Sequence, residues 1–324
     1  MGVHFHFVIT MDLVQLKRFL IAAEAGTLRQ AALRLHLSQP ALTQSIKALE
    51  RALGEAVFVR GTQGVVLTPF GEALRPRAQL ILNERTRIGQ DLERLRSGQA
   101  SQLSVGVGPY FTRHLLPVAV ARTLERIPTL QIHLVEGHTR ELVKQVQDGS
   151  LDLAFCVHNP LIAEDPDLRF EETYAECYSV MARASHPLFR RRRATEKDLA
   201  ACSWIVYDSH ATAGFLTDFF TRRGLAAPAW SISTLSLSAM IGALNSTDLL
   251  ALVPRDYALP ELAARRLKRV TGHALEVTGR GGLLTRRHAP ESAAAHQLIT
   301  QIRAACAAAA PPVPARRRRA APRH

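Results

Sequence analysis

Residues 11–54 contain three stretches in which apolar side chains recur every three or four positions, a spacing that places them on one side of a helix. The stretches contain Leu13, Leu16, Phe19, Leu20 and Ala23, then Leu28, Ala31, Ala32 and Leu35, then Leu42, Ile46, Leu49 and Leu53. Thr27 and Ser38 precede the second and third stretches, and such hydroxyl side chains cap helix N-termini. Three short helices are therefore predicted, the third beginning at about Gln39 with Pro40 in its first turn.

The second and third helices would be joined by residues 36–38, the length of turn found in a helix-turn-helix motif. On the polar side of the third helix, short side chains come first and cations follow. They are Gln39, Thr43 and Gln44, then Lys47 and Arg51. A helix that contacts base edges needs this order, because the cations bind phosphates. A solvated face on a small helical bundle is the alternative, and the pattern favours DNA recognition over it.

A hairpin is predicted directly after the third helix. Gly54 can end that helix, and the apolar runs 57–60 and 65–67 flank a turn at residues 61–64. Such a hairpin would hold Arg60 beside the third helix, where it could contact the DNA backbone or minor groove. An ordinary hairpin that only covers the helices is the alternative.

The stretch from Leu13 to Pro69, with AALRLHLSQPALTQSIKALERALG and VFVRGTQGVVLTPFGEAL, resembles the winged helix-turn-helix of the LysR-type transcriptional regulators. A weaker resemblance continues to about Ala305. It implies that Gln39, Pro40, Thr43, Gln44 and Arg60 stand where such regulators contact DNA. The chain departs from many relatives at Gln44, where they carry arginine. The full set of predicted DNA-binding residues is Thr27, Ser38, Gln39, Pro40, Thr43, Gln44, Lys47, Arg51 and Arg60.

Residues 69–98 are predicted to form a linker helix that also joins subunits. Thr68 can cap a helix starting at Pro69, and apolar residues recur there every seven positions, as in a coiled coil. Arg85 within the seam and Pro76 near its start argue against a long straight zipper. A helix packed on its own domain is the alternative, and the resemblance favours subunit pairing. The predicted dimerisation residues are Leu74, Ile81, Ile88, Leu92 and Leu95.

Strand and helix patterns alternate over residues 102–305, which implies parallel sheets covered by helices. Strands are expected at 103–108, 130–137, 151–157, 177–181, 204–207, 249–253 and 282–284, with a terminal helix to about 305. By resemblance this is a two-lobed, periplasmic-binding-protein-like effector domain, with lobe I at about 102–160 and 272–305 and lobe II at about 161–271. The predicted fold is thus a winged helix-turn-helix domain (11–68), mostly α, a linker helix (69–98), an α/β effector domain (102–305) and a tail (306–324).

An effector site is predicted where strands end and helices start, because free amides at helix N-termini suit anions. The segments 108–112 and 138–139 follow the first two strands of the domain. The family architecture places residues of lobe II at the same cleft. The predicted set is Gly108, Pro109, Tyr110, Thr112, His138, Thr139, Ser209, His210 and Thr212. Plain helix caps are the alternative; a pocket for a small carboxylate or sulfonate, with Tyr110 and Phe111 on its apolar side, is preferred. Relatives often have a hydroxyl where this chain has Gly108.

The net charge of +13 is concentrated at the two ends of the 324-residue chain. Residues 1–98 hold 13 basic and 8 acidic side chains, and residues 307–324 hold 5 basic ones and no acidic one. Basic ends around a nearly neutral body fit nucleic-acid binding at the ends. The tail PPVPARRRRAAPRH has the composition of a disordered basic arm, which would either add DNA affinity or simply be solvated.

Other classes of protein find little support. No apolar run reaches the ~18 residues of a membrane span, and the N-terminal stretch MGVHFHFVIT lacks the features of a signal peptide. Met11 is a second candidate start, which would make residues 1–10 an appendage. Residues 106–108 lack the third glycine of a dinucleotide fingerprint, and GxxxxGK, HExxH and GxSxG do not occur. The 13 histidines are dispersed. An enzyme is therefore disfavoured, and no catalytic residue, metal or cofactor is expected.

The four cysteines, Cys156, Cys177, Cys202 and Cys306, form no Cys-x-x-Cys pair. A thiol-based redox sensor of the same fold is the closest alternative, and the absence of cysteine from residues 208–211 places it second. The prediction is a cytoplasmic homodimer or homotetramer that binds an inverted repeat in double-stranded DNA. A small anionic or aromatic acid would close the lobes and change the spacing or bend of the site, with RNA polymerase as a further partner.

Overall fold

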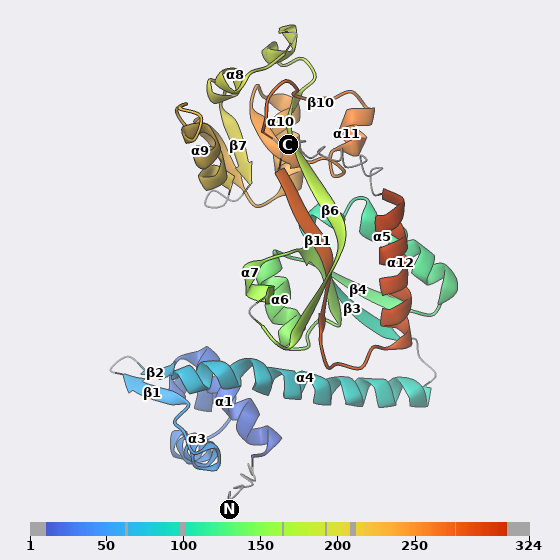
Figure 1. Ribbon diagram of the computed structural model, residues 1–324. Coiled ribbons are helices and arrows are strands. Elements are labelled where there is room, and N and C mark those ends of the chain that lie inside the picture. The colour runs from blue at the N-terminus through green and yellow to red at the C-terminus, as the bar shows by residue number, and fades with distance from the viewer. Residues whose placement is uncertain are drawn as a thin grey trace, which may run out of the picture.

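The computed structural model describes residues 11–61, 64–97, 101–163, 165–191, 193–207, 212–275 and 277–309. Within them, a small helical unit carries a two-stranded hairpin, a long helix leads out of it, and an α/β body lies on the far side of that helix (Figure 1). The first unit and the long helix consist of α1 (Leu13–Ala25), α2 (Leu28–Arg34), α3 (Gln39–Leu53), β1 (Phe58–Gly61), β2 (Gly64–Leu67) and α4 (Pro69–Ser97).

The predicted helix-turn-helix is present, and its caps explain its boundaries. Thr27 Oγ1 accepts the N–H of Gln30 at 3.2 Å, and Ser38 Oγ accepts that of Ala41 at 3.3 Å. Gly54 ends α3 in the left-handed region at φ 76°, where glycine is favoured. The apolar faces of the three helices meet in one core, whose fully buried members include Phe19, Ala22, Ala31, Leu42 and Leu49.

Helix α4 is fixed to the hairpin and to this core. Thr68 Oγ1 donates to Ala56 O at 2.7 Å and accepts the N–H of Gly71 at 3.0 Å. A Cβ on Gly71 would lie 2.2 Å from Val57 O, so only glycine lets the helix approach this closely. The helix runs unbroken through Pro76, and Figure 1 shows it as one long rod. The wing and α4 therefore move as one piece.

The described strands of the body form a single nine-stranded sheet in the order β4-β3-β5-β11-β6-β9-β7-β8, with β10 beside β6. Parallel pairs occur at both ends of the sheet, as predicted, while β6 and β11 in the middle are antiparallel to their neighbours. The strands are β3 (Gln102–Val107), β4 (Gln131–Glu136), β5 (Leu153–Val157), β6 (Leu168–Arg183), β7 (Trp204–Tyr207), β8 (Trp230–Thr234), β9 (Leu250–Pro254), β10 (Leu267–Arg269) and β11 (Val277–Arg286).

Strands β6 and β11 are much longer than the sequence predicted, at 16 and 10 residues, and each runs from one lobe into the other. Tyr174 of β6 still packs in the core of lobe I, and Val277 of β11 packs against the core of lobe II, so the chain crosses between the lobes within these two strands. The glycines of β11 interrupt its apolar pattern, so the sequence predicted only the short strand at residues 282–284. A Cβ on Gly282 would lie 2.1 Å from Glu171 O on β6, so the close strand contact requires a residue of low strand propensity.

Helices cover both faces of the sheet. In lobe I, Leu153 and Phe155 of β5 face α5 and α12, while Ala154 and Cys156 face α6 and α7. Helix α12 continues past the predicted end near residue 305, because Cys306 is buried in the core of lobe I. The helical elements are η1 (Pro109–Phe111), α5 (Leu115–Arg126), α6 (Thr139–Gln147), α7 (Pro160–Ala163), η2 (Pro187–Arg190), α8 (Glu196–Ala200), α9 (Ala213–Thr221), α10 (Leu237–Ser246), α11 (Leu259–Ala263) and α12 (Ala293–Ala309).

Candidate DNA interface and effector site

Helix α3 has a buried face and a polar exposed face. Leu42, Ile46 and Leu49 lie in the core of the helical unit. Most of the predicted base- and phosphate-contacting side chains are exposed on the other face, and Thr43 is half-buried. The exposed ones are Gln39, Pro40, Gln44, Lys47 and Arg51. Short polar groups thus lie at the start of the helix and cations towards its end, which is the arrangement that major-groove contact requires.

Of the remaining predicted DNA-binding residues, the structure describes the side chains of Thr27 and Ser38 but not that of Arg60. Thr27 and Ser38 cap helices with their hydroxyl oxygens, and a hydroxyl that accepts a backbone N–H can still donate its own proton to a phosphate. The backbone of Arg60 pairs with Val65 in the wing, and its side chain lies outside the described part of the structure.

Two polar contacts that the sequence did not reveal hold α3 in place. Arg18 Nη1 on α1 donates to the buried Ser45 Oγ on α3 at 2.9 Å. Glu50 Oε1, near the end of α3, accepts the N–H of Val57 at 3.0 Å, where the wing begins. Arg18 and Glu50 are single charged residues within amphipathic helices, so the sequence did not distinguish them from ordinary surface residues. They set the position of α3 relative to α1 and the wing.

The predicted dimerisation residues do not share one environment. Leu74 packs against the core of the helical unit. Ile81, Ile88 and Leu92 are 37%, 55% and 52% exposed, although they are large apolar side chains. The side chain of Leu95 lies outside the described part. An apolar strip along the middle and far end of α4 is therefore left open on the single chain.

The predicted effector residues of lobe I gather where β3 and β4 end. Gly108 and Pro109 are buried at the start of η1, and His138 is the N-cap of α6. Tyr207 Oη, at the end of β7 in lobe II, lies 3.3 Å from His138 Nδ1. The structure therefore brings a strand end of lobe II to the start of α6 in lobe I.

Tyr110 fills the space between the two lobes. Its ring centroid lies 5.8 Å from that of Tyr178 and 5.7 Å from that of Tyr207, and the side chain packs against the cores of both lobes. Phe111 was expected beside it in the pocket, and that expectation is wrong. Phe111 is only 1% exposed, and its ring centroid lies 4.2 Å from that of Phe155 inside lobe I.

The three predicted threonine hydroxyls each donate to a backbone carbonyl. Thr112 Oγ1 donates to Pro109 O at 2.9 Å, Thr139 Oγ1 donates to Val157 O at 3.2 Å, and Thr212 Oγ1 donates to Tyr207 O. These donations anchor the loops that carry the threonines, and the hydroxyl oxygens can still accept a hydrogen bond. Ser209 and His210 lie outside the described residues.

Position 108, where the resemblance implies a serine or threonine in many relatives, has room for a Cβ in this chain. A Cβ on Gly108 would meet Cys156 Cα at 3.4 Å and Phe155 O at 3.6 Å, which is ordinary van der Waals contact. Glycine at this position is therefore compatible with its neighbours without being required by them.

Glu176 on β6 is an ionisable residue of the site that the sequence did not single out. It is 4% exposed, and its Oε2 accepts a hydrogen bond from Tyr178 Oη at 2.9 Å. Burial raises the pKa of this carboxyl from 4.5 to about 7, and the hydrogen bond from Tyr178 opposes that rise. Tyr178 in turn hydrogen-bonds Tyr110, and burial followed by the nearby Glu176 charge raises the Tyr178 pKa. A polar chain therefore extends from Tyr110 to Glu176.

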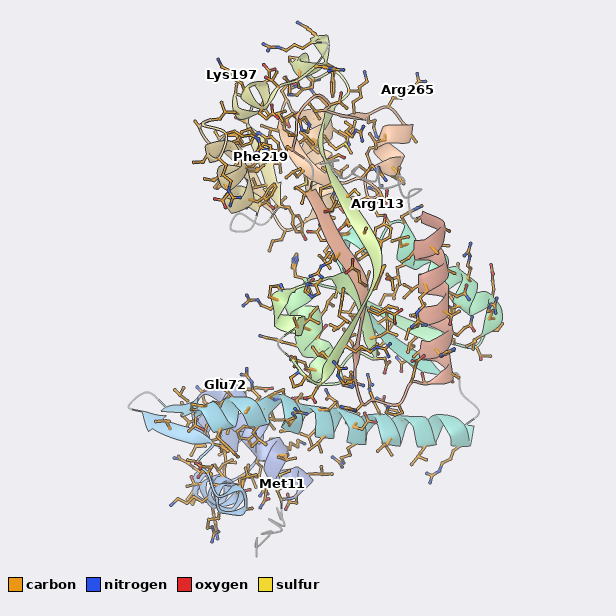
Figure 2. All side chains as sticks on the ribbon, viewed as in Figure 1. Met11, Glu72, Arg113, Lys197, Phe219 and Arg265 are labelled. Atoms are coloured by element: carbon orange, nitrogen blue, oxygen red, sulfur yellow. The ribbon has the colours of Figure 1, made fainter. Side chains whose placement is uncertain are left out.

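An ion pair joins the lobes at a second point. Arg113, just after η1, donates through Nη2 to Oε1 of Glu261 on α11 at 3.2 Å, and its guanidinium lies 4.9 Å from the ring centroid of Tyr257. Glu261 is 4% exposed. Figure 2 shows Arg113 at the junction of the two lobes. The lobes thus meet through an aromatic contact and an ionic one.

Three of the four cysteines do not resemble reactive thiols. All four are free, and Cys156 is fully buried beside the effector residues. Burial raises the pKa of its thiol to about 12, although the Thr139 hydroxyl opposes this, and burial also raises the pKa of Cys202 and Cys306. A thiolate is the form that reacts with peroxides, so these three sites are unsuited to fast oxidation near neutral pH.

The described part of the chain contains neither a metal-binding cluster nor a membrane-spanning helix. No cluster of three or more His, Cys, Asp or Glu side chains there could hold a metal ion. None of the helices found there combines the length and the apolar character needed to cross a bilayer.

Comparison with known families places both parts of the chain. Residues 13–72 match the family described as "Bacterial regulatory helix-turn-helix protein, lysR family", and residues 96–307 match "LysR substrate binding domain". The "SDS degradation transcriptional activation protein" of a Pseudomonas species is 29% identical over 258 residues, which are 79% of this chain and 83% of the relative.

A second relative, a "Probable hydrogen peroxide-inducible genes activator" of Mycobacterium leprae, is 28% identical over 295 residues, covering 89% of this chain and 91% of its own. Among solved structures, full-length CbnR complexed with its target DNA matches with a TM-score of 0.60 at 22% identity, over 91% of this chain and all of that one (100%). At this identity the likeness shows a shared fold.

Proposed function

Because the chain belongs to the LysR family of DNA-binding transcriptional regulators, we propose that it acts in the cytoplasm as a homo-oligomer on an inverted-repeat promoter site and that a small acid modulates it. The observation that carries the DNA-binding part is helix α3. It buries Leu42, Ile46 and Leu49 while it exposes Gln44, Lys47 and Arg51. A two-fold pair of such helices fits two half-sites in successive major grooves. RNA polymerase is the partner through which activation would occur.

The exposed strip Ile81, Ile88 and Leu92 on α4 supports the subunit contact. Three large apolar side chains at helical spacing on one free face form the kind of surface that pairs with a copy of itself. The strip lies on the same rigid piece as the wing, so pairing of two α4 helices would also set the spacing of the two recognition helices. The proposed homodimer rests on this contact, and a tetramer would need a second contact between two such dimers.

The start of α6 supports the small-acid effector. Its N-terminus carries the positive end of the helix dipole, and it lies beside the polar groups of His138, Tyr207 and Tyr110. The aromatic rings of Tyr110, Tyr178 and Tyr207 suit a ligand that is aromatic as well as acidic. A ligand bound there would contact both lobes and could favour one of their arrangements.

The experiment that tests this function starts with DNA. Full-length protein is used to select duplexes from a randomised pool, and the enriched sequences are compared with the DNA upstream of its own gene and of neighbouring operons. An enriched inverted repeat with nanomolar binding is the expected result. A reporter behind that promoter is then screened with aromatic acids in cells carrying the wild type or Thr139→Val. A response in the wild type that the variant loses supports the effector site, whereas equal responses would place the effector elsewhere.

The relative named for hydrogen peroxide induction favours redox sensing as a second candidate. The buried thiols of Cys156 and Cys306 oppose it, because burial raises the pKa of both. Treatment with low micromolar peroxide followed by mass spectrometry decides between the two. A sulfenic acid or disulfide within seconds, together with loss of the response in a Cys177→Ser or Cys202→Ser variant, would favour the redox function.

A further inference from the structure

Helix α4 contacts two different parts of the chain on different sides. Leu74, Ala78 and Leu82 pack into the core of the helical unit. Leu80, Asn83 and Arg87 face lobe I of the body. The same rigid helix therefore touches both the DNA-binding unit and the effector domain.

The contact with lobe I involves the loop of residues 148–152, between α6 and β5. Asn83 Nδ2 donates to Asp148 O at 2.6 Å and to Ser150 Oγ at 3.2 Å. Arg87 Nη1 lies 2.6 Å from Asp152 Oδ1, and the two side chains are only 24% and 26% exposed. We call these contacts of Asn83 and Arg87 with residues 148–152 the latch. A partly buried, charge-assisted pair of this kind is stronger than a surface ion pair.

The loop is tied to the rest of lobe I on every side. Asp152 Oδ2 accepts the N–H of Ser104 on β3 at 2.7 Å. Arg286 of β11 donates through Nη1 to Val146 O at 2.8 Å and to Leu151 O at 2.9 Å, so one guanidinium joins the end of α6 to the loop. Gly149 has a φ of +76°, and it lies close to Leu80 of α4. A Cβ added to Gly149 would be 2.8 Å from Leu80 Cδ1. The loop is therefore joined to the end of α6, to strands β3 and β11, and to α4.

The other end of α6 carries the candidate effector residues. His138 caps this helix and Thr139 is its first residue, while Val146 and Gln147 lie at its end. A nine-residue helix spans about 14 Å at 1.5 Å per residue, and it transmits a displacement of one end to the other because it is stiff. The effector site and the latch are thus the two ends of one short rod.

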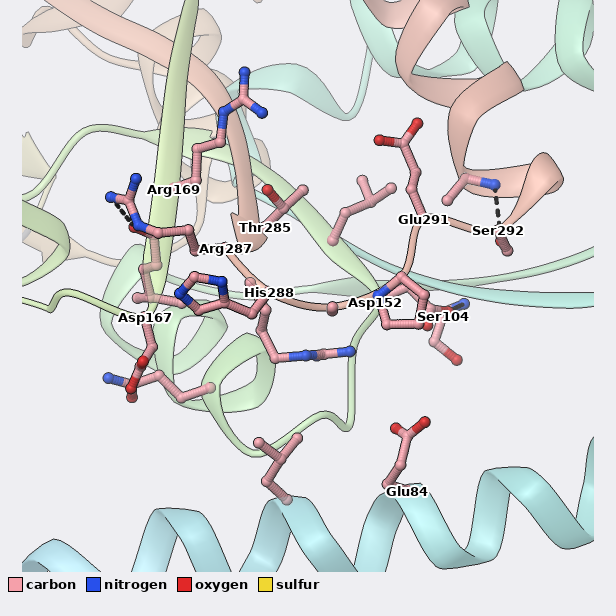
Figure 3. A pocket seen from close by; sticks show the side chains of 18 of the residues that line it. Glu84, Ser104, Asp152, Asp167, Arg169, Thr285, Arg287, His288, Glu291 and Ser292 are labelled. Atoms are coloured by element: carbon pink, nitrogen blue, oxygen red, sulfur yellow. Dashed lines mark hydrogen bonds between the residues drawn. The ribbon is translucent and has the colours of Figure 1, made fainter.

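Next to the latch, lobe I and α4 are separated by a groove of about 1270 Å³. Its walls include Leu80, Glu84 and Arg87 of α4 and residues 285–295 of lobe I. Figure 3 looks into the groove, with α4 along one wall and Glu84 pointing from it towards lobe I. Arg77 of α4 and Asp167 of lobe I also line the groove and form an ion pair. Lobe I is therefore held to α4 by the latch and by this pair, with the groove between lobe I and the helix.

We propose that the latch is the coupling between the effector lobes and the DNA-binding unit: movement of α6 alters the Asn83 and Arg87 contacts and so changes the angle between lobe I and α4. This rests on the proposed function, in which the lobes respond to a ligand at the start of α6. In a dimer joined through α4, a change in that angle alters the path of the DNA between the two half-sites.

Hydrogen exchange on the full-length protein tests the physical coupling without any ligand. Arg87→Ala removes the latch ion pair, Arg87→Lys keeps the charge, and Arg96→Ala is the control because it removes the same charge from an exposed position on α4. We expect peptides covering 146–153 and also 138–143 to exchange about tenfold faster in Arg87→Ala, to be intermediate in Arg87→Lys, and to be unchanged in Arg96→Ala. Faster exchange confined to 146–153, or none, would overturn the coupling.

DNA bending by the same variants tests the functional consequence. On a duplex selected by the wild type, Arg87→Ala and Asn83→Ala should bind within about threefold of wild-type affinity and bend the DNA by a different angle. An unchanged bend angle would refute the latch as a coupling, and so would a large loss of affinity in Arg87→Ala alone, which would make Arg87 a DNA contact. A wild type that selects no duplex refutes the proposed function instead, and hydrogen exchange then decides the latch.

Discussion

Glu176 shows how the burial of a single carboxyl group can make the folding stability of a domain depend on pH. The unfolded chain titrates this carboxyl near 4.5, whereas burial raises its pKa to about 7 in the folded protein. The folded state therefore binds the proton more tightly. The contribution of protonated Glu176 to the free energy of unfolding is complete below pH 4.5. It falls as the pH rises from about 4.5 to about 7 and is lost above that.

Glu176→Gln should abolish this part of the pH dependence and stabilise the protein above pH 7 by up to about 3 kcal/mol, because no charge has to be buried. Urea unfolding at pH 5 and pH 8 measures the effect. Glu172→Gln, at an exposed position on the same strand, is the matched control. If the variant loses as much stability between the two pH values as the wild type does, Glu176 is not the group responsible.

The exposed face of α3 gives a second prediction at the residue scale. Gln44 is exposed near the start of the helix, so Gln44→Ala should leave folding intact and cost roughly 1–3 kcal/mol in binding to the preferred site. Lys47→Ala should instead weaken binding to many sequences and reduce the slope of affinity against salt. Titrations of preferred and scrambled duplexes at several salt concentrations separate the two effects. Unchanged affinity of the soluble Gln44→Ala variant would exclude it from the base-contacting set.

At the scale of elements, α4 gives a prediction about assembly. Ile81→Glu places a carboxylate in the apolar strip, and a symmetric dimer would bury it twice, which should cost several kcal/mol of association. Ile81 is 37% exposed on the single chain, so the fold should tolerate the change. Sedimentation at low micromolar concentration should then show monomer where the wild type is dimeric, with weaker DNA binding. A variant that remains dimeric would show that α4 is not the main contact.

Elements with a regular apolar period and a local cap were predictable from the sequence, while elements defined by distant partners were not. Helices α1 to α3 have both signals, in residues such as Thr27 and Ser38. Strand β11 was predicted only at residues 282–284, because Gly279 and Gly281 interrupt the apolar pattern of its first half. The same distinction applies to the candidate site. His138 and Thr139 could be found as a helix start, whereas Glu176 is distinguished only by its burial and by its hydrogen bond from Tyr178.

At the scale of the whole molecule, the Arg113–Glu261 pair should help hold the lobes in the arrangement described. Arg113→Ala leaves the buried Glu261 carboxylate without this partner, which should cost about 2 kcal/mol, a value reduced because Arg113 is about a third exposed. Denaturant unfolding measures the loss, and Arg122→Ala, at an exposed position on α5, is the control. Equal midpoints for the two variants would show that the ion pair contributes nothing to stability.

Strands β6 and β11 also determine at which positions the chain can be divided into fragments that fold. Each supplies residues to both lobes, and together they lie at the centre of the sheet. A fragment containing either lobe alone would expose bare strand edges and half of a core, so it should aggregate when expressed. A fragment of residues 101–309 keeps both strands whole and should be soluble and crystallisable. Circular permutants should likewise tolerate new ends at surface loops and fail when the break falls within either long strand.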